Sequence, residues 1–325
     1  MTNSTLDLRE KMELLFLGTG SGVPSKLRNV SSIALKLLAE RNSVWLFDCG
    51  EGTQHQILKT TLKPRKIEKI FITHMHGDHI YGLPGLLSSR GFQGGEEPVT
   101  VYGPTGIRSY IQMSLRYSGT RLSYPIHFVE FEQEGVIYKD DQFKVTVKKL
   151  QHGLPSYGFR IEEANHEGTL DAEKLKALNI PSGPVYGRLK NKETVELEDG
   201  RVLDGRDFVG PTQKGRIVTI LGDTIKHPNS VKLAKNADVL VHEGTFGANE
   251  ENLAREYNHS TTAQAASVAK EANAKQLLLT HFSSRYLYKD LKAIEKDTRK
   301  IFPNTMIMQD LQEIDIPLNK ESDAE

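Results

Sequence analysis

Short apolar runs recur along this chain and predict β-strands. Each run is rich in Val, Ile, Leu and Phe and is closed by Gly, Asp or His, a pattern typical of strands that end at a turn. The runs in the first half are MELLFLGTG, SSIALKL, SVWLFDCG, KIEKIFITH, PVTVYG and FKVTVKKLQH. Those in the second half are GRIVTILGD, ADVLVHEG and KQLLLTHF.

Apolar residues at helical spacing predict amphipathic helices between some of these strands. The segments are TGIRSYIQMSLRYSG, STTAQAASVAKEANA and YKDLKAIEKDTRKIF. In the second, Thr261 followed by Gln264 matches a capping box, which predicts that the helix begins near Thr261. Strands alternate with helices in both halves, so the pattern indicates an α/β fold of layered sheets covered by helices.

One segment, from about Gly158 to Gly215, breaks the pattern. It is charged and rich in Gly and Pro, and the text around LEDGRVL predicts a small hairpin. Because it has little to bury, we interpret about residues 160–207 as an insertion or protruding arm within a single domain, 12–318; a long surface loop is the alternative. The polar ends, 1–11 and 319–325, are expected to be disordered extensions.

Composition limits the class of protein. The chain has 325 residues, 38% hydrophobic and 26% charged, which is typical of a soluble globular protein. Lys+Arg and Asp+Glu both number 42, so a polyanion would have to bind a local basic patch. The lone Cys49, which we interpret as a small buried hydrophobe, excludes an internal disulfide and fits a cytoplasmic location. No run is apolar enough to suggest a membrane span, and residues 1–11 lack the apolar stretch of a signal peptide.

The stretch HMHGDH, behind the strand KIEKIFIT, indicates a metal site. Zinc and similar ions prefer imidazole nitrogen and carboxylate oxygen where thiolates are absent. His74 and His76 are two residues apart, so an extended backbone points both the same way, and Gly77 allows a sharp turn. Asp78 and His79 then face a second position. Four such residues suit two ions better than one. The alternative to a metal site is a loop that is rich in histidine by chance.

Three more candidates stand at strand ends, namely His152, Asp223 and His281. Strand ends of α/β sheets are where sites gather. Together the seven residues supply five imidazoles and two carboxylates, which suits two ions with one bridging carboxylate and one bridging hydroxide. We interpret four other histidines as surface or core residues: His55, His127, His166 and His227.

The chain resembles the metallo-β-lactamase superfamily over residues 12–318. The resemblance lies in the order of its motifs, which is HxHxDH, then a histidine at a strand end, then GDT and then a last histidine. Within it the chain closely resembles the ribonuclease Z (tRNase Z) family, short form. PSKLRN is similar to that family's PxKxRN loop, HEGTF to its HEAT loop, HST to its HST loop, and GPVYGRLK to the GP motif of its tRNA-clamping arm. Gly244 departs from the alanine of HEAT, which leaves a detail of that loop's geometry open.

The resemblance implies an αββα sandwich of metallo-β-lactamase type with a protruding arm insertion. It implies a dinuclear site at the sheet edges with two Zn²⁺ per subunit, other divalent ions being possible. One ion would be held by His74, His76 and His152, the other by Asp78, His79 and His281, with Asp223 bridging both. It also implies that Asp48 is a structural aspartate beside the metal-bearing loop; a free surface carboxylate is the alternative.

Two ions about 3.5–4 Å apart can share a hydroxide that attacks phosphorus in line with the leaving oxygen. Asp78 is the candidate residue to accept or orient the proton of the nucleophile. The alternative is that Asp78 serves only as a metal ligand. His259, just before the predicted helix start, is the candidate partner of the leaving 3′-oxygen. It acts either as an acid or as a neutral hydrogen-bond donor. The helix N-terminus disfavours a protonated ring and therefore favours the neutral donor. Glu243 could orient His259, or be an ordinary surface glutamate.

The resemblance implies precursor tRNA with a 3′ trailer as substrate, cut to leave a 3′-hydroxyl on the tRNA and a 5′-phosphate on the trailer. It also implies a homodimer in which one subunit's arm holds tRNA for the other's site. From the lack of an apolar span we expect no membrane partner. Basic clusters in SKLRN, KPRK and GRLKNK suit phosphate contacts, although most such clusters are solvated faces. Arg285 either grips a phosphate or forms an internal salt bridge. The expected substrate-binding residues are Lys26, Arg28, Asn29, Gly183, Pro184, Tyr186, Arg188, Lys190 and Arg285.

Two other functions compete with a zinc-dependent endoribonuclease. A hydrolase of small phosphodiesters, esters or sulfates would use the same fold but would not need a distant tRNA clamp. A non-enzymatic RNA-binding or scaffold relative would have lost its metals, against which the complete ligand set argues.

Overall fold

The computed structural model describes residues 11–166 and 168–318. These divide into a large unit, residues 11–162 and 217–317, and a small unit within residues 163–216. The extensions expected at 1–10 and 319–325 lie outside the described residues. Lys11, which we counted in the first extension, forms an ion pair with Glu13, with 2.6 Å between Nζ and Oε1.

The first sheet of the large unit has the strand order β16-β1-β2-β3-β4-β5-β6. Pairing is antiparallel from β16 to β3 and parallel from β3 to β6. The strands are β1 (Met12–Gly18), β2 (Ser32–Leu37), β3 (Ser43–Phe47), β4 (Ile67–Phe71), β5 (Val99–Pro104), β6 (Ile126–Phe131) and β16 (Glu313–Ile316).

The second sheet has the order β15-β14-β13-β12-β9-β8-β7. Its strands β12 to β15 are parallel neighbours, whereas β9 pairs with β12, and β7 with β8, in antiparallel fashion. The strands are β7 (Gly135–Lys139), β8 (Phe143–Leu150), β9 (Ser156–Glu163), β12 (Ile217–Leu221), β13 (Val239–Glu243), β14 (Gln276–Thr280) and β15 (Thr305–Ile307).

The two sheets pack face to face over a core rich in aromatic residues. Trp45 and Phe71 of the first sheet and Phe159 of the second are buried in one cluster. Phe47 stacks on Phe71 with 4.9 Å between ring centroids. All seven residues of β1 are buried, because one face of that strand meets this core and the other meets helices.

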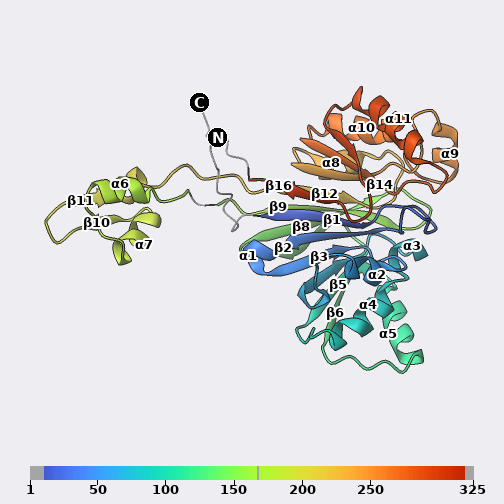
Figure 1. Ribbon diagram of the computed structural model, residues 1–325, viewed down its shortest axis with the longest axis horizontal. Coiled ribbons are helices and arrows are strands. Elements are labelled where there is room, and N and C mark those ends of the chain that lie inside the picture. The colour runs from blue at the N-terminus through green and yellow to red at the C-terminus, as the bar shows by residue number, and fades with distance from the viewer. Residues whose placement is uncertain (1–10, 167, 319–325) are drawn as a thin grey trace. The chain divides into compact units, whose positions relative to one another are not determined.

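Helices cover the outer face of each sheet (Figure 1). The first sheet packs on α2 (Thr53–Leu58), α4 (Leu83–Phe92) and α5 (Ile107–Tyr117). The second packs on α8 (Pro228–Ala234), α10 (Thr262–Glu271) and α11 (Tyr288–Arg299). The expected αββα sandwich is therefore confirmed. The shorter helices are α1 (Leu38–Arg41), α3 (Gly77–Ile80) and α9 (Glu251–Glu256), with a 3₁₀ turn at Pro64–Lys66.

The predicted start of α10 is confirmed. Thr261 is its N-cap, and its side chain accepts from the backbone N–H of Gln264, whose own side chain accepts from the backbone of Thr261. This reciprocal pair satisfies two of the free N–H groups at the helix start.

The small unit contains α6 (Ala172–Ala177), α7 (Pro184–Lys190), a 3₁₀ turn (Gly205–Asp207), β10 (Thr194–Glu196) and β11 (Val202–Asp204). The antiparallel pairing of β10 and β11 confirms the hairpin predicted around LEDGRVL.

The expectation that this segment has little to bury is wrong. It has its own apolar cluster, made of Leu175, Ile180, Leu189, Val195 and Phe208. The unit begins later than the expected residue 160, because β9, which is paired with β12, continues to Glu163. It also extends beyond the expected residue 207, to Arg216.

Candidate metal centre

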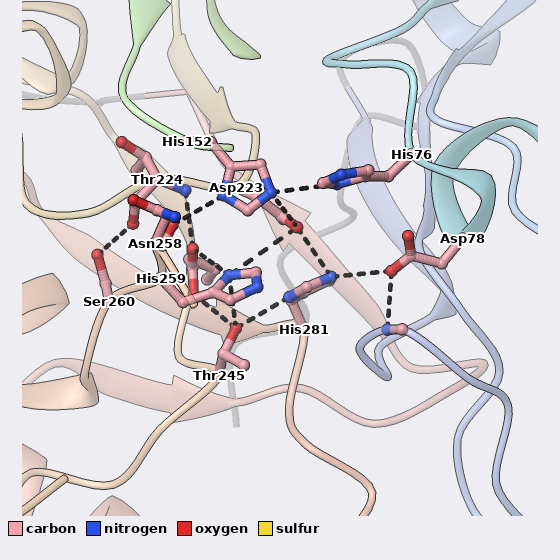
Figure 2. A network of polar contacts seen from close by, with 12 residues as sticks. His76, Asp78, His152, Asp223, Thr224, Thr245, Asn258, His259, Ser260 and His281 are labelled. Carbon is pink, nitrogen blue, oxygen red and sulfur yellow. Dashed lines mark hydrogen bonds and ion pairs between the residues drawn. The ribbon is translucent and has the colours of Figure 1, made fainter. Parts of the chain in front are cut away.

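Seven histidine and aspartate side chains converge at one edge of the large unit, and five of them are labelled in Figure 2. Four follow β4 and continue into α3, namely His74, His76, Asp78 and His79. The other three follow the ends of β8, β12 and β14, namely His152, Asp223 and His281. The cluster thus draws on four segments that only the packed sheets bring together.

His74, His76 and His152 form the first of two groups. Nδ1 of His76 lies 3.1 Å from Nε2 of His74 and 3.1 Å from Nε2 of His152. The backbone at His76 is extended, with φ −65° and ψ 149°, as expected for two histidines that point the same way. Three ring nitrogens around one point are the arrangement that a tetrahedral ion requires.

Asp78, His79 and His281 form the second group. Nε2 of His281 lies 3.3 Å from Nε2 of His79 and 3.3 Å from Oδ2 of Asp78. The chain turns at Gly77, where the extended backbone of His76 gives way to α3 and the backbone N–H of His79 donates to the oxygen of His76 at 3.0 Å. Gly77 is not among the residues with positive φ. A Cβ at Gly77 would lie 2.2 Å from the ring of the exposed Tyr81, so that side chain would have to move to accept a larger residue.

Asp223 lies between the two groups (Figure 2). Its Oδ2 lies 3.6 Å from Nε2 of His74 and 4.0 Å from that of His152, both in the first group. The same oxygen lies 3.4 Å from Nε2 of His79 and 3.2 Å from that of His281, both in the second. One carboxylate oxygen therefore faces both groups, the position that a bridging ligand needs.

Four of the histidines are held by a hydrogen bond at Nδ1, the ring nitrogen that does not face the ligand group. Nδ1 of His74 lies 2.9 Å from Oγ1 of Thr73, and Nδ1 of His281 lies 2.9 Å from Oγ1 of Thr245. Each hydroxyl donates its only hydrogen to a carboxylate, so it accepts from the histidine. Nδ1 then carries the ring hydrogen, and Nε2 is free to bind a metal. The remaining pairs are His79 with Asp48 and His152 with the carbonyl of Asn258.

Asp48 is not a free surface carboxylate, because only 6% of it is exposed. Its Oδ1 accepts from the backbone N–H of Thr73 at 2.8 Å. Its Oδ2 accepts from Oγ1 of Thr73 at 2.8 Å and from Nδ1 of His79 at 2.7 Å. Asp48 thus holds both ends of the metal-bearing segment.

Charge within the cluster favours a bound cation. Burial lowers the pKa of His74 well below its usual value, so this ring is neutral. Burial raises the pKa of Asp223, but His281 and His79 outweigh it and the pKa lies well below the ordinary value. For Asp78 the hydrogen bond with His281 likewise outweighs burial and lowers the pKa. Burial lowers the pKa of His79, but Asp223 and Asp48 outweigh it and raise the pKa well above its usual value, so a metal that binds there displaces a proton. Imidazole and carboxylate are the donor types that divalent ions such as zinc prefer, so the donor set fits such ions.

Glu243 lies beside this cluster and is 1% exposed, so it is not an ordinary surface glutamate. Its Oε1 accepts from the backbone N–H of Thr224 at 2.8 Å and lies 2.9 Å from Nδ1 of His259. Burial lowers the pKa of His259, but the Glu243 carboxylate and Asp223 outweigh it and raise the pKa to about 9. These carboxylates oppose the effect of the nearby helix N-terminus, which disfavours a protonated ring.

The glycine in HEGTF fits its surroundings. A Cβ at Gly244 would lie 3.0 Å from Cγ2 of Thr262 and 3.3 Å from Cζ of Phe282. The side chains around this position have therefore closed over a glycine, and an alanine there would require them to shift.

The three residues expected to bind substrate in the PSKLRN loop differ in exposure. Lys26 is exposed, whereas Arg28 is 9% exposed and donates to the backbone oxygen of Met308 at 2.7 Å. Asn29 donates from its side chain to the backbone oxygen of Glu51 at 2.8 Å. In this structure Arg28 and Asn29 brace the loop, and their contact with substrate stays a prediction.

The other expected substrate-binding residues lie in two places. Gly183 is the N-cap of α7, and Pro184, Tyr186, Arg188 and Lys190 belong to that helix in the small unit. Tyr186 donates to the backbone oxygen of Ile180 at 2.9 Å, Arg188 pairs with Glu193 at 3.0 Å, and Lys190 is exposed. In the large unit Arg285 forms the internal salt bridge, 2.5 Å from Oε1 of Glu250.

The four histidines set aside from the sequence lie outside every His/Asp/Glu group found among the described residues. His55 and His127 are exposed, and His166 and His227 are half-buried. His227 caps α8, where its Nδ1 accepts from the backbone N–H of Asn229.

The two stacked sheets and the cluster at their edge define a protein of the metallo-β-lactamase fold. A structure of that fold, YhfI from Bacillus subtilis, aligns with a TM-score of 0.65 at 19% identity over 94% of this chain and 100% of the other. A family described as "Anti-Pycsar protein Apyc1" matches residues 12–172. Among the described residues no helix is long and apolar enough to cross a membrane.

Within that fold, the chain belongs to the ribonuclease Z family. It is 60% identical to ribonuclease Z of Ligilactobacillus salivarius over 97% of this chain and 100% of the relative, and 61% identical to that of Enterococcus faecalis over 96% and 100%. Human tRNase Z, short form, aligns with a TM-score of 0.67 at 31% identity, covering 94% of this chain and all of the human one. The resemblance inferred from the sequence motifs is confirmed.

Proposed function

We propose that this chain removes the 3′ trailer from precursor tRNA, leaving a 3′-hydroxyl on the tRNA and a 5′-phosphate on the trailer, with two divalent ions, zinc by preference. Membership of the ribonuclease Z family makes it a tRNA 3′-processing endoribonuclease. The observation that carries the finer proposal is the position of Asp223, one oxygen of which faces four imidazoles in two groups.

Each group of ligands would hold one ion. When bound, the pair of ions lowers the pKa of a shared water and neutralises charge on the reacting phosphate. Asp223 would contribute to both positions. The first ion would be held by His74, His76 and His152, and the second by Asp78, His79 and His281.

Asp78 would orient the attacking water or accept its proton, beside its role as a ligand. The backbone N–H of Gly22 donates to Oδ2 of Asp78 at 2.8 Å, so the carboxylate is held by the loop that precedes PSKLRN. A carboxylate fixed from outside the metal-binding segment keeps one orientation during the reaction, which is what a group that positions a nucleophile needs.

His259 would donate a hydrogen bond or a proton to the leaving 3′-oxygen. Its Nδ1 is held by Oε1 of Glu243, so Nε2 is the nitrogen left for the substrate. Glu243 is in turn held by Thr224 and Thr245. Glu243 is therefore proposed as a positioning residue, and His259 as the residue that contacts the leaving group and yields the 3′-hydroxyl of the product.

The small unit would bind the body of the tRNA. Its separate apolar cluster supports an independently packed clamp. Lys190 and Arg188, which pairs with Glu193, are exposed on α7, so their cationic side chains are accessible to phosphates. As in the family, we propose a cytoplasmic homodimer in which the small unit of one subunit holds tRNA for the metal centre of the other.

Cleavage of a 3′-extended precursor tRNA by Asp223→Ala tests the catalytic proposal, with zinc content measured on each protein. Wild type should carry zinc and cut after the discriminator base, and Asp223→Ala should lose most of both metal and activity. Asp141→Ala, at an exposed carboxylate, is the matched control. A metal-loaded wild type that hydrolyses only small chromogenic phosphodiesters would refute the tRNA substrate and favour the small-molecule hydrolase.

A deletion tests the clamp. Replacing residues 168–212 by a short glycine–serine linker preserves the ion pair of Glu163 with Arg216 and the backbone pairing of His166 with Gln213. The variant should lose tRNA cleavage but keep hydrolysis of a chromogenic phosphodiester. Retention of full tRNA cleavage would refute the clamp.

A further inference from the structure

A groove of about 630 Å³ lies in the large unit between the loop that carries PSKLRN and the start of α11. Its apolar wall includes Leu27, Leu287 and Leu291, and Tyr288 stands at its side with 56% of the residue exposed. The groove is not part of the metal centre, since none of its lining residues belongs to the two ligand groups.

Both walls of the groove run from the metal centre. One wall follows from Gly22, whose N–H donates to Asp78, to Ser25, where the groove begins. The other follows from the ligand His281 to Ser283. Two or three residues span at most about 7–11 Å of chain. The groove therefore begins close to the metal centre, within reach of an RNA strand that leaves the centre between these loops.

The charge of the groove suits a polyanion. Lys26 and Lys292 line it, and neither pairs with a carboxylate in the part of the chain that the structure describes. The two acidic residues that line it are engaged within the protein. Glu295 pairs with Arg299 at 2.8 Å, and Asp310 accepts from the backbone of Thr19 at 3.0 Å.

Tyr288 and Lys292 form a unit on the exposed face of α11. They are one helical turn apart, and Nζ of Lys292 lies over the Tyr288 ring, 4.6 Å from its centre, which leaves the opposite face of the ring for a base. An aromatic ring beside a lysine is the combination that binds single-stranded nucleic acid, because the ring stacks on a base while the cation meets the phosphate. Duplex RNA offers phosphates and shape but no free base face.

We propose that this groove binds the single-stranded 3′ trailer, with Tyr288 stacking on a trailer base and Lys292 meeting its phosphate. This inference rests on the proposed function and assigns the groove to the part of the substrate that is discarded. The acceptor stem is a duplex, so the unpaired trailer is the portion of the precursor whose chemistry fits the aromatic side chain.

The experiment compares two precursors, with trailers of one and of about ten nucleotides. Tyr288→Ala should lower kcat/KM for the long trailer about five- to tenfold more than for the short one, as expected for one lost stacking contact. Lys292→Ala should reduce the slope of log(kcat/KM) against log(salt concentration) by about 0.7 on the long trailer, as for one phosphate contact on a single strand. Tyr288→Phe should restore the wild-type ratio, since the ring is kept.

Two matched controls separate the groove from general effects. Tyr117→Ala removes an exposed tyrosine at the end of α5, and Lys289→Ala removes an exposed lysine of α11 that does not line the groove. Both should leave the ratio between the two precursors as in wild type. Equal losses in Tyr288→Ala and Tyr117→Ala would overturn the proposal.

A crosslinking measurement on the wild type needs no variant. A precursor with 4-thiouridine in its trailer should crosslink to the peptide that contains Tyr288 and Lys292. Crosslinks confined to other peptides, or a changed oligomeric mass in Tyr288→Ala, would overturn the groove. If the wild type cut neither precursor, the proposed function itself would fail, which is a separate outcome.

Discussion

Replacement of Asp48 by Asn tests whether hydrogen bonds outside the ligand set hold the metal centre. Asn has the shape of Asp and tolerates the positive φ of 55° found at this position, so the backbone is not strained by the change. In Asp48→Asn one oxygen can still accept from the backbone N–H of Thr73. The amide nitrogen then faces Nδ1 of His79, which is 2.7 Å away in the wild type.

Two N–H groups cannot share that contact. His79 must either lose the hydrogen bond or move its ring hydrogen to Nε2, the nitrogen that points toward Asp223 and the ligand group. A hydrogen on Nε2 blocks metal binding. Loss of such a supporting carboxylate weakens metal affinity by about 10- to 100-fold, or about 1.4–2.7 kcal/mol.

The assay is competition with a calibrated zinc chelator, read with cleavage of precursor tRNA at limiting zinc. Asp48→Asn should need about 10- to 100-fold more free zinc for half-maximal activity, while saturating zinc recovers much of the rate. Asp141→Asn, at an exposed position, should behave as wild type. Wild-type zinc affinity in Asp48→Asn, with circular dichroism showing a native fold, would refute the reasoning.

Three further predictions concern buried polar groups. Thr245→Val removes the hydroxyl that donates to Glu243 and should lower the free energy of unfolding by about 1–3 kcal/mol, measured by urea denaturation. Burial raises the pKa of Cys49 to about 12, so a thiol reagent at pH 8 should react with it only after denaturation. Burial raises the pKa of Glu163, but its bonds with Arg216 outweigh this and lower it. The stability that this pair contributes should be present above pH 4.5 and should be lost as the pH falls through the lowered pKa of Glu163 in the folded protein. Glu163→Gln should speed hydrogen exchange across residues 163–216 at pH 7.

The sequence determined the elements that carry strong local signals. The nine apolar runs form strands of the two sheets, and the three amphipathic patterns form α5, α10 and α11. The first metal-binding segment could be predicted from the sequence because its four candidate ligands, between His74 and His79, lie within six consecutive positions. The start of α10 was readable because Thr261 and Gln264 interact across a single helical turn.

The sequence pattern missed strands whose signal is weak or comes from their neighbours. β6 and β7 lie at the edges of their sheets, and apart from the buried Phe131 their residues are exposed or half-buried, so no continuous apolar run marks them. β9 contains Gly158 and Arg160 but is held between β8 and β12. In these places tertiary pairing decided the structure, since β-propensity depends on the environment of the strand.

Only the tertiary structure decided how the metal centre is held. His79 and His281 are 202 residues apart in sequence, yet their Nε2 atoms lie 3.3 Å apart. The supporting roles of Thr73 and Thr245 were not visible in the sequence, because threonine is common and its function here comes from a buried carboxylate on one side and an imidazole on the other. The inward position of Arg28 was likewise set by packing against the core. Local sequence encodes contacts within a turn or a strand, whereas these contacts exist only once both sheets have closed on each other.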